Sequence, residues 1–129
     1  MSYLALLLVA KIAVSALLVA LPFLVMPQAK LEATTRVSAK SALFFRLYGV
    51  AITALLVGYG FGIPTAESGQ FPWGVVSMGL VSNSGAAFLL LRSSKPNSSG
   101  FWLGSFFAFV AVGLAVSISA PSLALSKAW

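Results

Sequence analysis

Three polar side chains inside apolar segments are the residues that could do chemistry: Lys11, Arg46 and Asn83. A cation and a hydrogen-bonding amide can attract an anion or a small polar solute, and a charge within a membrane span is by default a functional-site hypothesis. Catalysis has little to draw on, because acid/base chemistry usually needs His or paired carboxylates. The chain has no His, Cys or Asp, and its only acids are Glu32 and Glu67. We therefore predict a protein that is not an enzyme and uses no metal or other cofactor.

Lys11 lies about eight residues into the first apolar segment, or roughly 12 Å along a helix. Its long side chain can snorkel toward the membrane surface. We expect it to point outward with Ser15 one turn below it, and to reach lipid headgroups. Contact with a partner subunit and a solute or ion site are the alternatives. This orientation assumes that the opposite, small-residue face packs inside the protein, a face made of Ala10, Ala13, Ala16 and Ala20.

Arg46 begins a small-residue face on the second apolar segment, shared with Gly49, Thr53 and Gly60. Such faces let helix backbones approach closely, so we expect this side to pack on neighbouring helices. Arg46 itself lies near the cytoplasmic boundary. There a guanidinium snorkels or binds an anionic lipid phosphate, and a role in transport is the alternative.

The third apolar segment carries Gly79, Ser82, Asn83 and Ala86 at i, i+3, i+4 and i+7, which places them on one helical face. A buried Asn can join helices through a hydrogen bond worth about 0.6 to 2 kcal/mol. Alternatively, this face is a polar lining for a small anion or solute. The fourth segment has a continuous small face for helix packing, made of Gly104, Ala108, Ala111 and Ala115.

The composition that surrounds these residues is typical of a membrane protein. Of the 129 residues, 60% are hydrophobic and only 8% are charged, whereas about a quarter are charged in soluble proteins. A helix needs about 20 apolar residues to cross the hydrocarbon core. We predict one membrane domain over residues 1–129, with four spans that cover about 3–25, 41–63, 72–91 and 101–120. Pro64 and Pro121 are expected to end the second and fourth spans.

The predicted fold class is an all-α bundle of four transmembrane helices in which sequential helices are antiparallel. Cytoplasmic loops carry an excess of Lys and Arg. The first and third connections hold that excess, so both termini are predicted on the outer, non-cytoplasmic side. The loop residues predict contact with anionic lipid headgroups and not with nucleic acid, because they do not form one basic face. They are Lys30, Arg36, Lys40, Arg92 and Lys95.

Two families of small four-span proteins differ from the chain at their functional residues. Small multidrug-resistance transporters use a Glu in the first span, where this chain has Lys11. Fluoride channels carry an Asn followed by Gly, superficially similar to Asn83 and Gly85, but this chain lacks their Gly-rich arginine motif. The segments FFRLYG and FPWG resemble bacterial four-helix membrane proteins. That resemblance implies the bacterial cytoplasmic (inner) membrane and transfers no function.

Two functional hypotheses follow. The first is a non-catalytic accessory or scaffolding subunit of a larger inner-membrane complex, which acts through helix–helix contacts with other subunits or with a second copy. The second is a small transporter or channel for an anion or small solute, homodimeric because four tightly packed helices enclose little space. It requires Lys11, Asn83 and Arg46 to converge on one cavity, which distinguishes it from the first.

Overall fold

Four helical stretches in the computed structural model, which describes residues 1–129, are long and apolar enough to cross a membrane. They are Tyr3–Val25, Leu43–Glu67, Trp73–Ser93 and Ser99–Ser119. The remaining helices are short, and the structure contains no strand. The prediction of an all-helical chain with four candidate membrane spans is therefore confirmed.

The first span is interrupted near its middle. It consists of α1 (Tyr3–Ser15), the π-helical turn η1 (Ala16–Ala20) and α2 (Leu21–Val25). Proline lacks an amide hydrogen, and its ring crowds the carbonyl four residues earlier. A wider π-helical turn just before Pro22 accommodates both effects. The span therefore continues past Pro22.

The second span, α4 (Leu43–Glu67), ends four residues later than predicted because Pro64 lies inside it. Proline removes only one amide donor, and the next residues still complete the last turn, with the Ser68 amide bonded to the Pro64 carbonyl at 3.0 Å. The polar turn therefore begins at Ser68 and not at Pro64. Pro121 ends α6 (Ser99–Ser119) as predicted, but it also starts a short helix, α7 (Pro121–Leu125).

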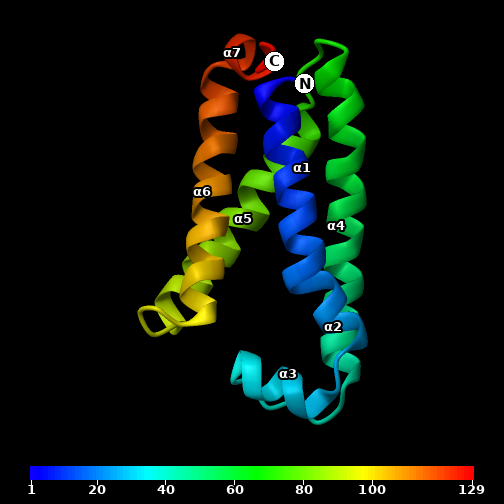
Figure 1. Cartoon of the computed structure of the whole chain (residues 1–129), viewed down its shortest axis with the longest axis vertical. Helices are drawn as coiled ribbons and strands as arrows, with labels where there is room; N and C mark the ends of the chain where they lie inside the picture. The colour runs from blue at the N-terminus through cyan, green and yellow to red at the C-terminus, as the bar shows by residue number, and fades with distance from the viewer.

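The spans form two helical hairpins. One pairs α1, η1 and α2 with α4, and the other pairs α5 (Trp73–Ser93) with α6. Figure 1 shows both chain termini at one end, which we call the terminal end, and α3 (Gln28–Thr35) with the α5–α6 connection at the other, the loop end. The hairpins approach each other near the terminal end and diverge toward the loop end (Figure 1).

Buried apolar residues follow the same division. The main cluster has eleven members, including Leu8, Tyr59, Val76 and Leu114, one from each of the four spans. A second cluster, closer to the loop end, has only three buried members: Val19, Ala87 and Phe107. Most of the hydrophobic contact between the hairpins therefore lies in the half that carries the termini.

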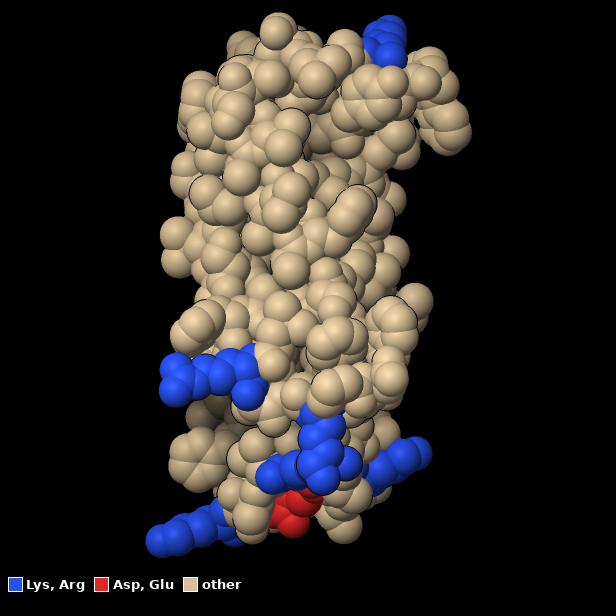
Figure 2. All heavy atoms as spheres, turned by 90° about the vertical axis from the view of Figure 1, so that its left-hand side faces the viewer, with Lys and Arg blue, Asp and Glu red and all other residues tan.

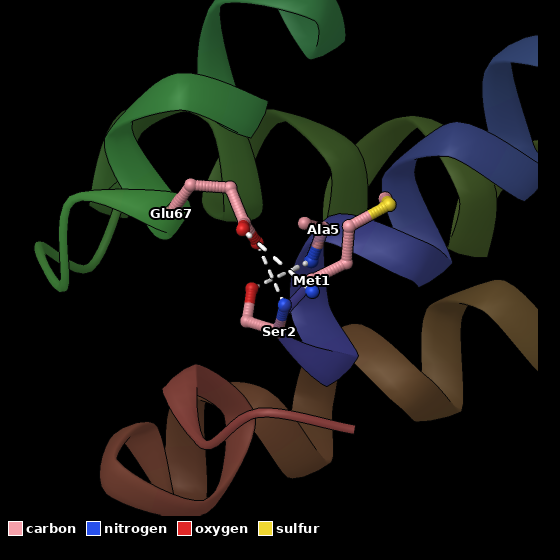
Figure 3. Close-up of polar contacts among 4 residues, drawn as sticks. All are labelled: Met1, Ser2, Ala5 and Glu67. Carbon is pink, nitrogen blue, oxygen red and sulfur yellow. Dashed lines mark hydrogen bonds and ion pairs between the residues drawn. The ribbon is translucent and has the colours of Figure 1, made fainter. Parts of the chain in front are cut away.

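The terminal end is closed by Glu67, the last residue of α4. Its carboxylate accepts a hydrogen bond from the Ser2 amide at 2.6 Å and lies 3.9 Å from the Met1 amine (Figure 3). Ser2 also caps α1, because its hydroxyl accepts from the Ala5 amide at 3.2 Å. We call these four residues, Met1, Ser2, Ala5 and Glu67, the Glu67 clasp. They join the start of the first span to the end of the second.

The loop end carries most of the charge. On the face shown in Figure 2, Lys and Arg side chains gather at this end, and little basic surface lies at the opposite end. Within the first loop, the Glu32 carboxylate accepts hydrogen bonds from Gln28 Nε2 at 2.9 Å and from the Ala39 amide at 3.0 Å. The Gln28 and Ala39 hydrogen bonds lower the pKa of Glu32 below its usual value. Glu32 thus holds the end of the loop against α3.

Candidate polar site between the hairpins

Lys11 points into the protein, so the prediction that it faces outward was wrong. Only 7% of its surface is exposed, and it lies on the same face of α1 as the buried Leu4 and Leu8. Ala10 and Ala13, expected inside, are exposed. Leu4 and Leu8 belong to the main buried cluster, and Lys11 shares their face of α1, so it turns inward with them.

The Lys11 ammonium has one hydrogen-bond partner and no counter-charge. Nζ donates to the hydroxyl of the buried Ser15 at 2.8 Å. It also lies 4.0 Å from the centroid of the Phe107 ring on α6. Such a contact contributes about 2 kcal/mol when desolvated, less than the cost of burying an unpaired charge. The structure has one ion pair, between Met1 and Glu67, so no carboxylate neutralises Lys11.

Asn83 on α5 is the second buried polar group, with 1% of its surface exposed. Its Nδ2 donates to the Tyr59 hydroxyl at 2.8 Å and to the Gly79 carbonyl at 2.7 Å. The Tyr59 hydroxyl lies 3.1 Å from the Ser82 hydroxyl. Asn83 therefore joins α5 to α4, as expected of a polar residue between membrane helices. Its Oδ1, however, is buried without any hydrogen-bond partner.

Lys11 and Asn83 line the same small cavity. Its volume is about 30 Å³, and Tyr59 and Ser82 also line it. That volume is about one water molecule's share of liquid water. Tyr48 of α4, another lining residue, is 47% exposed, which places one side of the cavity near the surface of the chain. The cavity lies among residues of all four spans.

Arg46 does not join Lys11 and Asn83. Its guanidinium crosses from α4 to α2 and donates to the Phe23 carbonyl at 2.7 Å and to the Met26 carbonyl at 2.8 Å. The last carbonyls of a helix lack intrahelical partners. Arg46 provides hydrogen-bond partners for these carbonyls at the end of the first span. Its two hydrogen bonds join that span to α4.

Most of the predicted packing residues lie at close helix contacts. A Cβ atom added at three of the glycines would meet a side chain of a neighbouring helix at 3.0 Å or less: Gly49, Gly79 and Gly104. Ala111 is buried, Ala108 packs beside the cluster of Val19, Ala87 and Phe107, and Ala86 lines the cavity.

Three predicted packing residues make no such contact. Nothing lies within 4 Å of a Cβ built at Gly60. Thr53 is exposed and bonds the Gly49 carbonyl of its own helix at 2.8 Å, and Ala115 is also exposed. These three residues contribute little to packing within the chain, because the hairpins meet on only part of each small-residue face.

Two residues of the site were not predicted from the sequence. Tyr59 has a hydroxyl in an apolar helix, a signal that it seeks a buried partner. Phe107 gives no such signal, because it is one of four aromatic residues between 101 and 107. Only the packing of α6 against α1 shows which ring covers the ammonium.

Comparison with known proteins finds no matching family model, curated protein or solved structure. The chemistry of the site therefore rests on its own geometry. Its side chains offer a cationic donor, hydroxyl groups and a free amide oxygen around a water-sized space. This set of groups is suited to binding a small polar species.

Proposed function

We propose that this chain is a small membrane transporter for an anion or small polar solute, and that the ligand binds between Lys11 and Asn83. One observation carries the proposal: the same cavity is lined by Lys11, whose buried ammonium has no counter-charge, and by Asn83, whose buried amide oxygen has no partner. Both groups are costly to bury unsatisfied, and a bound ligand offsets both costs.

The surroundings of the cavity favour a transporter over an open channel. Arg46 bonds helix carbonyls and does not extend a polar path from the cavity. Between the cavity and the loop end, Val19, Ala87 and Phe107 are packed together. A solute can pass only if these side chains separate, and the diverging hairpins of Figure 1 have few contacts to oppose that movement.

Anion flux into proteoliposomes tests this function. Proteoliposomes swell in potassium nitrate when nitrate enters through the protein and valinomycin carries the potassium. We expect the swelling rate to be lower in Lys11→Met by about tenfold or more, the rate change of an interaction worth about 1.4 kcal/mol. Lys30→Met is the matched control, since Lys30 is an exposed lysine of the loop end. Equal rates in the two variants and the wild-type protein would remove Lys11 from transport and contradict the proposal.

We further propose that the terminal end faces outward and the loop end faces the cytoplasm of a bacterial cell. The basic residues at the loop end support this orientation, since they suit anionic headgroups of the inner leaflet. The chain has no Cys, so single cysteines at Ser126 and Ser38 can be labelled with a membrane-impermeant maleimide. Intact spheroplasts should label Ser126→Cys alone, and the reverse result would invert the topology.

An accessory subunit that acts by helix contact is the second proposed function. It is favoured by large exposed side chains on α6, where Trp102 is 63% exposed and Phe109 is 69% exposed. A partner subunit or a second copy could pack on them. Gentle detergent extraction at native expression, followed by size analysis, tests this function, and a lone monomer would count against it.

A further inference from the structure

The free oxygen of Asn83 limits the kind of ligand that fits. Both amide hydrogens of Asn83 are used, one by the Tyr59 hydroxyl and one by the Gly79 carbonyl. Exchanging the amide nitrogen and oxygen would turn Oδ1 toward the Gly79 carbonyl, which cannot donate. The observed assignment is therefore the consistent one, and Oδ1 is an acceptor that needs a donor.

Lys11 has the opposite requirement. An ammonium has three hydrogens, and only one of them is used, by Ser15. The Phe107 ring faces the charge but accepts no ordinary hydrogen bond. The remaining hydrogens need an acceptor. The positive charge also needs a negative charge nearby, because no carboxylate of the chain reaches it.

We infer that the site takes a small monovalent oxyanion that retains a hydroxyl group, of the bicarbonate class. This inference rests on the proposed function and names its substrate class. The hydroxyl oxygen accepts from Lys11, and its hydrogen is donated to Asn83 Oδ1. Nitrate or a halide carries the charge without the donor, and water carries the donor without the charge. The cavity of about 30 Å³ holds one oxygen-sized group, so the rest of the ligand lies toward the exposed Tyr48.

Bicarbonate and nitrate form a matched pair for the test, because both are planar, monovalent and alike in size, and only bicarbonate has a hydroxyl. The measurement is the thermal unfolding midpoint of the purified full chain in detergent, at equal pH and ionic strength. Bicarbonate should raise the midpoint of the wild-type protein. The nitrate concentration that gives the same shift should be about tenfold higher than the bicarbonate concentration. This is the fold-change in affinity expected when one hydrogen bond to a buried group is not formed.

Variants distinguish the role of the Lys11 charge from the role of the Asn83 acceptor. Lys11→Met should lose the response to both anions, whereas Lys30→Met should keep it. Asn83→Ala should respond equally to both anions, because the acceptor that distinguishes them is gone. If Asn83→Ala does not fold, Asn83→Asp serves instead. Its carboxylate supplies the counter-charge to Lys11, so neither anion should stabilise it.

The outcomes distinguish this inference from the transport proposal. Equal shifts with bicarbonate and nitrate in the wild-type protein, both lost in Lys11→Met, would overturn the hydroxyl requirement and leave an anion transporter standing. No shift with either anion would show that neither binds to the folded protein and would overturn the inference. Nitrate swelling that depends on Lys11 would still support transport in that case, and its absence would remove both proposals.

Discussion

The two halves of the molecule are built by different means. In the terminal half, all four spans contribute to one apolar core, and the Glu67 clasp joins the first span to the second. In the loop half, the hairpins diverge, and hydrogen bonds act within the first hairpin, from Arg46 to α2 and from Glu32 to its own loop. The polar cavity has lining residues from both hairpins. The terminal half thus holds the larger part of the contact between the hairpins, and the loop half joins them only through the smaller cluster of Val19, Ala87 and Phe107 and the groups around the cavity.

The largest expected effect is in the terminal half, at Gly79. A Cβ there would lie 2.8 Å from Leu114 Cδ1 and 2.9 Å from Tyr59 Cε1. We expect Gly79→Ala to lower the free energy of unfolding by roughly 1 to 3 kcal/mol through overpacking. Gly85→Ala on the same helix has open space, so it should be neutral or slightly stabilising. Unfolding in mixed micelles measures both variants, and equal stabilities would show that the spans do not meet at Gly79.

The next effect is in the loop half, at Arg46. Arg46→Met removes two hydrogen bonds to the carbonyls of Phe23 and Met26, at an expected cost of about 1 to 2 kcal/mol. In the variant Arg46→Lys, the lysine lacks the forked geometry of the guanidinium. It should recover only part of the lost free energy of unfolding. Amide hydrogen exchange should show faster opening of α2 and no change in α5 or α6. Faster exchange throughout the chain would contradict the separation of the two hairpins.

A smaller effect is expected at the Glu67 clasp. Ser2→Ala removes the N-cap of α1 and should cost about 1 kcal/mol, with the lost protection confined to the first turn. Ser68→Ala, at an exposed neighbouring position, is the control, since its hydroxyl bonds only a local carbonyl. The free energy of unfolding and hydrogen exchange at Ala5 measure the effect. Equal stability of the two variants would show that the Ser2 cap does not stabilise the terminal end.

The smallest effect is a pH dependence at Glu32. Its pKa is lowered in the folded protein, so its contribution to stability is present above the unfolded pKa of about 4.3 and is lost as the pH falls through the folded pKa. The amide resonance of Ala39 should move as Glu32 takes up its proton. Glu32→Gln should abolish that movement. An unchanged titration in the variant would assign it to another group.

The sequence predicts the spans well because their length and apolar composition are local properties. The end of the second span was harder, since Pro64 lies within a helix that the surrounding turns continue. The polar site was only half predictable. Asn83 was found from its helical spacing, but the direction of Lys11 depends on which face of α1 meets the other hairpin. That choice depends on contacts with residues far along the chain, which no local pattern reveals.

The contact between Lys11 and Phe107 also determines the order in which the protein can assemble. Ribosomes make the first span long before the fourth, so Lys11 reaches the membrane when its covering ring does not yet exist. Until α6 arrives, the ammonium must remain hydrated or extend to the lipid surface. We therefore expect the final inward turn of α1 to be a late step of biosynthesis, and a chain that ends before residue 99 to leave Lys11 uncovered by α6.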